Sequence, residues 1–94
     1  MTTYPRTIGN PEAELANANR GNIFEVEVRG FDADGVAVDD VTVTIWAANH
    51  RAAATKVARA IVPGSTVYHD RSANHLYGIG LNSGPTGLFL RPAC

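Results

Sequence analysis

The chain has 94 residues, which is enough for one small domain. Hydrophobic residues make up 45% of it and charged residues 18%, a balance typical of a folded globular chain and not of a disordered one. The formal net charge of −1 excludes a general electrostatic attraction for nucleic acid or anionic membranes, so either kind of binding needs a local basic patch.

We expect neither membrane insertion nor secretion. No run of the sequence approaches the roughly 20 apolar residues that a membrane span needs. The N-terminus lacks the basic and apolar regions of a secretory signal. The single cysteine, Cys94, excludes an intrachain disulfide and suits a reducing compartment. These features predict a cytoplasmic protein.

Residues 1–22 are predicted to be an N-terminal arm that contains one short helix. Asn10 is a good N-cap and Pro11 suits the first helical position, while acidic residues follow in the first turn. Gly21 lies beyond the end of this pattern. The helix is therefore expected over about 11–19.

Residues 23–62 predict a β-hairpin followed by a helix. Apolar and polar residues alternate in two strands, the first over about 23–31 and the second over about 36–47, and a turn at 32–35 joins them. The inner face of the hairpin consists of Phe24, Val26, Val28, Val41, Val43 and Ile45. The outer face consists of Glu25, Glu27, Arg29, Thr42, Thr44 and Trp46.

The alternation changes phase inside the second strand. Val36 and Val38 have even numbers, whereas the apolar residues from Val41 onward have odd numbers. One regular strand cannot direct both sets to the same face. Because one extra residue reverses the alternation, we predict a β-bulge or bend at Asp39–Asp40.

A helix is predicted over about 49–62, lying across the inner face of the hairpin. Asn49 can cap its N-terminus, and Pro63 with Gly64 ends it. The spacing of three and four residues predicts one apolar stripe, made by Ala53, Val57, Ala60 and Ile61.

Residues 65–90 predict further strands, over 67–71 and 77–81, and a short final strand over 88–90. Gly78 and Gly80 alternate with apolar residues and leave one face of their strand bare, which usually marks the close approach of another backbone or a ring. The whole chain, 1–94, is thus predicted to be a single small α+β domain. Its order is β-β-α-β-β, with a mostly antiparallel sheet and one main helix on one face.

The hairpin with the turn Phe31–Gly35, followed by an alanine-rich helix, resembles the arm-binding domains of tyrosine integrases. The resemblance covers about 23–62 and implies the hairpin and helix arrangement. Those domains read DNA through a three-stranded sheet rich in arginine and lysine. The corresponding outer face here lacks these basic residues and carries Glu25, Glu27, Thr42 and Thr44.

His69, Asp70 and His75, around a predicted turn, form the densest set of potential metal ligands. A metal-dependent hydrolase around them is one alternative function. A zinc site needs three or four ligands in a defined geometry, and His50, in the first turn of the helix, is expected to lie away from them. Surface histidines are the favoured interpretation. The aspartates near the hairpin turn do not match a calcium loop, so we predict no metal and no cofactor.

A sheet surface that needs a cover is the strongest functional candidate. Trp46 falls on the outer face, where an indole is costly to leave in water. The N-terminal segment, the C-terminal third or a partner must therefore cover it. We predict a non-enzymatic protein-binding or adaptor module, acting on another protein or as a homodimer. Its predicted partner-binding residues are Trp46, Thr42, Thr44, Gly78 and Gly80.

The composition favours the same function. Alanine and valine supply much of the hydrophobicity, so the core is expected to be thin and a partner or second copy to add stability. Small compact chains rich in alanine, glycine, valine and aspartate are often phage or mobile-element accessory proteins. By this association the predicted partner is a host protein.

A basic helix face supports another alternative. Arg51, Lys56 and Arg59 lie away from the apolar stripe of the predicted helix, which carries no acidic residue. Such a face can contact phosphates or an acidic partner. Nucleic-acid binding through these residues is the alternative function, although a solvated helix face is the commoner explanation.

Overall fold

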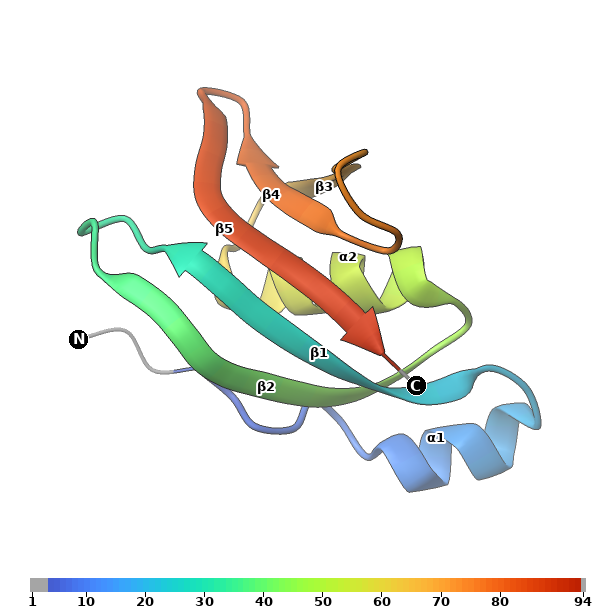
Figure 1. Cartoon of the computed structure of the whole chain (residues 1–94). Coiled ribbons are helices and arrows are strands. Elements are labelled where there is room, and N and C mark those ends of the chain that lie inside the picture. Colours follow the sequence, from blue (N-terminus) through green and yellow to red (C-terminus); the bar gives the residue numbers. More distant parts are fainter. Residues whose placement is uncertain (1–3, 94) are drawn as a thin grey trace.

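The computed structural model describes residues 4–93, so the first three residues of the predicted arm and Cys94 lie outside the described chain. In it, two helices accompany one five-stranded sheet, in which every strand pairs antiparallel with its neighbours in the order β2-β1-β5-β4-β3 (Figure 1). The elements are α1 (Pro11–Ala18), β1 (Asn22–Phe31), β2 (Ala37–Ala47), α2 (His50–Ile61), β3 (Thr66–His69), β4 (Tyr77–Leu81) and β5 (Gly84–Ala93). The predicted α+β fold and its β-β-α-β-β order are confirmed, as is the short N-terminal helix.

The predicted bulge in β2 is also confirmed. The register of β1 and β2 shifts at Arg29, which faces Asp39–Asp40 as a pair. The extra residue reverses the alternation, so Val38 before it and Val43 after it are both buried. Val36 does not join them, because it lies outside β2, beside the hairpin turn, and is 60% exposed.

Helix α2 begins where the sequence predicts. The side chain of Asn49 accepts a hydrogen bond of 2.8 Å from the backbone N–H of Ala52 and caps the helix. The buried residues of the helix are Ala53, Ala54, Val57 and Ala58. The predicted apolar stripe of the helix was wrong at Ala60, which is exposed. The helix is rotated so that adjacent pairs of positions face the sheet.

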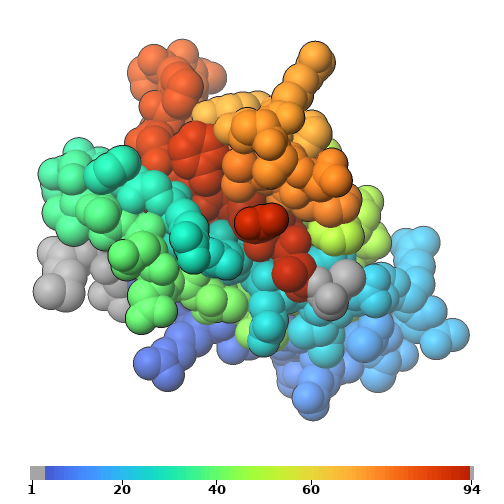
Figure 2. All heavy atoms as spheres, in the orientation of Figure 1, coloured from blue at the N-terminus to red at the C-terminus, as the bar shows by residue number. Residues whose placement is uncertain are grey.

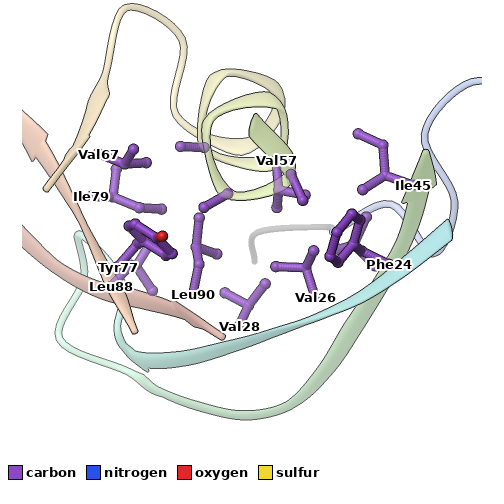
Figure 3. Close-up of a cluster of buried hydrophobic side chains, with 14 of the residues drawn as sticks. Phe24, Val26, Val28, Ile45, Val57, Val67, Tyr77, Ile79, Leu88 and Leu90 are labelled. Carbon is purple, nitrogen blue, oxygen red and sulfur yellow. The ribbon is translucent and has the colours of Figure 1, made fainter. Parts of the chain in front are cut away.

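The core lies between α2 and the concave side of the sheet (Figure 3). Val26 and Val28 of β1 point from the sheet towards Val57 of α2, and Ile79 and Leu90 of the C-terminal strands fill the other half (Figure 3). The largest side chains with less than 2% exposure are Phe24, Ile45, Ile79 and Leu90. The predicted inner face of the hairpin is therefore confirmed, with Val41 only partly buried against the core.

Strand β5 differs most from its prediction. It extends over Gly84–Ala93 and lies between β1 and β4, where Leu90 pairs with Val28 on one side and Tyr77 on the other. This segment contains glycine and proline, two residue types that are depleted in strands. The pairing with two neighbours, which local sequence does not reveal, makes the strand longer than the predicted residues 88–90.

Helix α2 covers one face of the sheet only. In Figure 1 it lies behind β5, while α1 packs against β1 and β2 at one side of the sheet. The outer face of β3, β4 and β5, on the side away from α2, has no helix across it in the described chain. Neither helix there combines the length and apolarity that crossing a membrane requires.

We expect Leu90→Ala to lower the free energy of unfolding by about 2–5 kcal/mol, because the side chain is fully buried in a central strand. Leu81→Ala is the matched control, since Leu81 is 41% exposed and its truncation should cost about 1 kcal/mol or less. Urea unfolding followed by circular dichroism measures both. Equal losses for the two variants would contradict the assignment of the core.

Candidate binding surface

The structure does not bring the predicted partner-binding residues together. Thr42, Thr44 and Trp46 lie on β2 at one edge of the sheet, whereas Gly78 and Gly80 lie on β4. Strands β1 and β5 separate the two groups. The two halves of the predicted surface are therefore two distinct places on the sheet.

The Trp46 half is covered by the chain itself. The indole Nε1 donates a hydrogen bond of 2.9 Å to the backbone carbonyl of Arg20, in the loop between α1 and β1. The Lys56 ammonium lies 4.4 Å from the ring centroid and donates a 3.1 Å hydrogen bond to the Trp46 carbonyl. A side chain at Gly21 would meet the indole, with a Cβ only 2.9 Å from Nε1. The N-terminal segment, one of the three covers expected for Trp46, therefore contacts this ring.

The edge of β2 next to Trp46 is partly closed as well. The backbone N–H of Ile8 donates to the carbonyl of Thr44 at 3.0 Å, and the Thr44 N–H donates to Arg6 at 2.8 Å. These bonds place the arm parallel to β2 at this point. Natural proteins commonly protect an edge strand in this way. Thr42, two residues earlier, stays exposed.

In the half of the predicted surface that contains Gly78 and Gly80, an aromatic ring lies over the glycines. Tyr68 of β3 is directly opposite Gly78 of β4, and its ring lies over the bare glycine so closely that a Cβ at Gly78 would collide with it. A Cβ at Gly80 would also touch this ring, at 3.7 Å. The prediction that the bare positions mark the approach of a ring is confirmed. Tyr68 itself remains 38% exposed.

Tyr68 belongs to a row of side chains that crosses four strands on the outer face. The pairings of the sheet place Tyr68, Gly78, Phe89 and Arg29 side by side. Phe31, two residues further along β1 from Arg29, is on the same face and is 57% exposed. We call the three rings of Phe31, Tyr68 and Phe89 the outer aromatic face. Figure 2 views the molecule from this side, with β5 in red between β1 in teal and β4 in orange.

A shallow hollow adjoins the outer aromatic face. It has a volume of about 220 Å³ and is lined by Phe89, Leu76, Glu27, Arg29 and Arg91. Glu27 and Arg29 form an ion pair, the only one among residues 4–93. The hollow thus combines two apolar side chains with the guanidinium of Arg91, which forms no ion pair within residues 4–93. The sequence patterns did not predict this place, although the alternation in residues 88–90 sets Phe89 apart from its neighbours.

The structure does bring the three predicted basic residues together. Arg51, Lys56 and Arg59 line one shallow depression on α2. Two of them are bonded to backbone carbonyls of the chain, because Arg51 donates to Val67 at 3.4 Å and Lys56 donates to Trp46. Their charges remain, yet these two side chains are less free to reach a phosphate than an open helix face suggests.

The histidines are arranged differently from the expectation. His75 stacks on His50 at the start of α2, with ring centroids 3.8 Å apart and an interplanar angle of 15°. The expectation that His50 lies away from the other histidines was wrong. His69 instead lies against Tyr77, at 5.5 Å. Across residues 4–93 no three histidine, cysteine or acidic side chains are grouped as a metal ion would require.

The aspartates that were considered as ligands stabilise turns. One carboxylate oxygen of Asp32 accepts hydrogen bonds of 2.9 Å from the backbone N–H groups of Asp34 and Val36. The Asp70 carboxylate accepts one of 2.9 Å from the N–H of Ser72, and this bond lowers the pKa of Asp70. Side chains that hold a turn in this way are ordinary loop chemistry.

No protein-family model matches the chain, and no curated protein and no solved structure is significantly similar to it. Its function is therefore inferred from its own surfaces.

A double-mutant cycle tests the packing of Tyr68 on Gly78. Gly78→Ala should displace the ring and lower the free energy of unfolding by roughly 1 kcal/mol. In a Tyr68→Ala background the same change should cost less, with a coupling energy of about 0.5 kcal/mol or more. Thermal or urea unfolding of the four proteins gives this value. Additive effects would show that the ring does not rest on the glycine.

Proposed function

We propose that the chain is a small non-enzymatic protein-binding module that holds its partner on the outer aromatic face. One observation carries this proposal: in the described part of the chain, α2 covers the opposite face, so partly exposed aromatic rings stand on a sheet surface that no helix of residues 4–93 crosses. Aromatic residues and arginine are enriched in protein interfaces, because they bury a large area and still offer polar atoms.

The chemistry around the rings supports a protein partner over a phosphate-rich one. The hollow beside Phe89 has one ion pair and one further cation, Arg91, next to apolar walls. Glu25 on the same face adds a negative charge. A nucleic acid would meet this mixture of charges unfavourably, whereas a protein surface can match it.

The partner-binding residues that the sequence predicts take different parts in this proposal. Gly78 and Gly80 contribute by letting the Tyr68 ring lie flat, and Trp46 serves the attachment of the N-terminal segment. Thr42 and Thr44 lie at the far edge of the sheet and are assigned a lesser part. The partner is another protein or a second copy of the chain. A phage or mobile-element origin with a host target, and a cytoplasmic location, suit the composition and the single cysteine.

Nucleic-acid binding on α2 is the second candidate function. It is favoured by the grouping of Arg51, Lys56 and Arg59 on a helix without acidic residues. It ranks lower because two of these side chains already donate to backbone carbonyls. A metal-dependent hydrolase is not proposed, since His75 faces His50 and not His69.

Affinity capture from host lysate with three single variants tests the proposal. Phe31→Glu places a charge on the outer aromatic face, and we expect it to weaken partner capture about tenfold or more. Val36→Glu is the matched control, because Val36 is equally exposed but lies beside the hairpin turn. Arg59→Glu reports on α2. Val36→Glu and Arg59→Glu should both capture the partner as the unchanged protein does. Circular dichroism checks that all three variants fold.

Two outcomes would refute the proposal. In one, Phe31→Glu keeps the partner while Val36→Glu or Arg59→Glu loses it. In the other, the chain shifts DNA or RNA in a gel with a strong dependence on salt, and Arg59→Glu abolishes the shift. Light scattering on the purified protein then decides whether the captured partner is a second copy.

A further inference from the structure

We propose that His50 and His75 form a pH-sensitive latch, which holds the β3–β4 loop, residues 70–76, on the N-terminus of α2 at neutral pH and releases it in mild acid. The two imidazole rings are 25 residues apart in sequence, and their stacking joins the loop to the helix. Neither histidine belongs to the outer aromatic face.

The geometry around His50 leaves its ring little freedom. On one side it meets the buried Phe24 ring edge-on, with centroids 4.9 Å apart and an interplanar angle of 69°. On the other side it carries His75 in a parallel stack at 3.8 Å. The His50 ring therefore connects the core of the protein to the loop. Two parallel imidazoles at this separation tolerate at most one positive charge, because two would repel across the stack.

The loop depends on this contact for part of its shape. His75 has a backbone φ of +56°, a left-handed conformation that residues other than glycine adopt only when their surroundings enforce it. The base of the loop is closed by a 2.7 Å hydrogen bond from the Asp70 N–H to the carbonyl of Leu76, the residue next to His75. When the stack opens, the strained backbone at His75 is free to relax, and the neighbouring Leu76 carbonyl moves with it, so this hydrogen bond weakens as well.

The charged groups around His50 and His75 do not offset the repulsion that would arise if both imidazoles carried a proton charge. His50 is the first residue of α2, where the helix dipole disfavours a cation. Phe24 on β1 is uncharged, and Arg51 on the helix is a cation that donates to Val67. In the loop, the Asp70 carboxylate is bonded to the Ser72 N–H. Within residues 4–93, no carboxylate forms an ion pair with either imidazole.

The pKa of His50 agrees with this arrangement. Burial and the neighbouring His75 lower the pKa of His50 below its ordinary value of 6.5. Because the unfolded chain binds this proton more readily, the stabilising contribution is complete above about pH 6.5 and is lost as the pH falls through the folded value. The lowered pKa of Asp70 acts in a separate window, below its ordinary value of 3.8. Measurements between pH 5.5 and 7.5 therefore avoid that carboxylate.

Release of the loop also bears on binding, a consequence that rests on the proposed function. The loop follows β3, the strand that carries Tyr68. It ends at Leu76, which lines the hollow next to Phe89. Freeing the loop loosens both side chains. Partner capture through the outer aromatic face should therefore weaken in mild acid.

Amide hydrogen exchange of the full chain, followed by NMR, tests the latch without any partner. The reporters are the N–H groups of Asp70 and Ser72, which are hydrogen bonded inside the loop. Rates are converted to protection factors, because intrinsic exchange itself varies with pH. From pH 7.5 to 5.5 we expect their protection to fall at least about tenfold, while amides in β1 and β5 keep theirs.

Three variants separate the latch from general acid sensitivity. His50→Phe keeps a ring on Phe24 but cannot take a proton, so the loop should stay protected at both pH values. His69→Phe is the matched control and should behave like the unchanged protein. His75→Asn accepts the left-handed backbone but removes the stack, so protection should be low throughout. Constant protection in the unchanged protein, or a pH-dependent loss that persists in His50→Phe, would overturn the proposal. Loop release without any effect of Phe31→Glu on capture would sink the proposed function and leave the latch intact.

Discussion

A single amphipathic helix can bury only one face of a sheet, and this constraint organises the whole molecule. All five strands direct their buried apolar residues to the concave side, where α2 lies, and the core cluster is on that side. Strand β2 meets the constraint through the bulge at Asp39–Asp40, which lets Val38 and Val43 face the same side although they are five positions apart, an odd separation.

The same constraint leaves the convex side of the sheet to be finished by other means. Near the β2 edge the chain covers its own surface, with the indole of Trp46 bonded to Arg20 and approached by Lys56. Across β3, β4 and β5 it has instead the ring of Tyr68 over Gly78 and the partly exposed Phe89. One half of the convex side is thus closed within the chain. The other half carries aromatic residues and arginine, residue types that are enriched in protein interfaces.

The hairpin, its bulge and α2 were predictable because their signals are local. Periodicity, an N-cap at Asn49 and a phase change at Asp39–Asp40 are all legible in consecutive residues. The full length of β5 was not predictable, since two neighbouring strands and not its own propensity define it. The His50–His75 stack and the cover on Trp46 each join residues distant in sequence, so no local pattern announces them.

Deleting Thr44 tests most directly whether strand phase against α2 governs the fold. With this residue removed, Val43 and Ile45 become neighbours in β2 and point to opposite faces, so one of the two buried side chains must leave the core. We expect the free energy of unfolding in urea to fall by about 1.5–3 kcal/mol. Thr44→Ala, which keeps the length of the strand, should change it by no more than about 1 kcal/mol. A deletion as mild as this substitution would contradict the account.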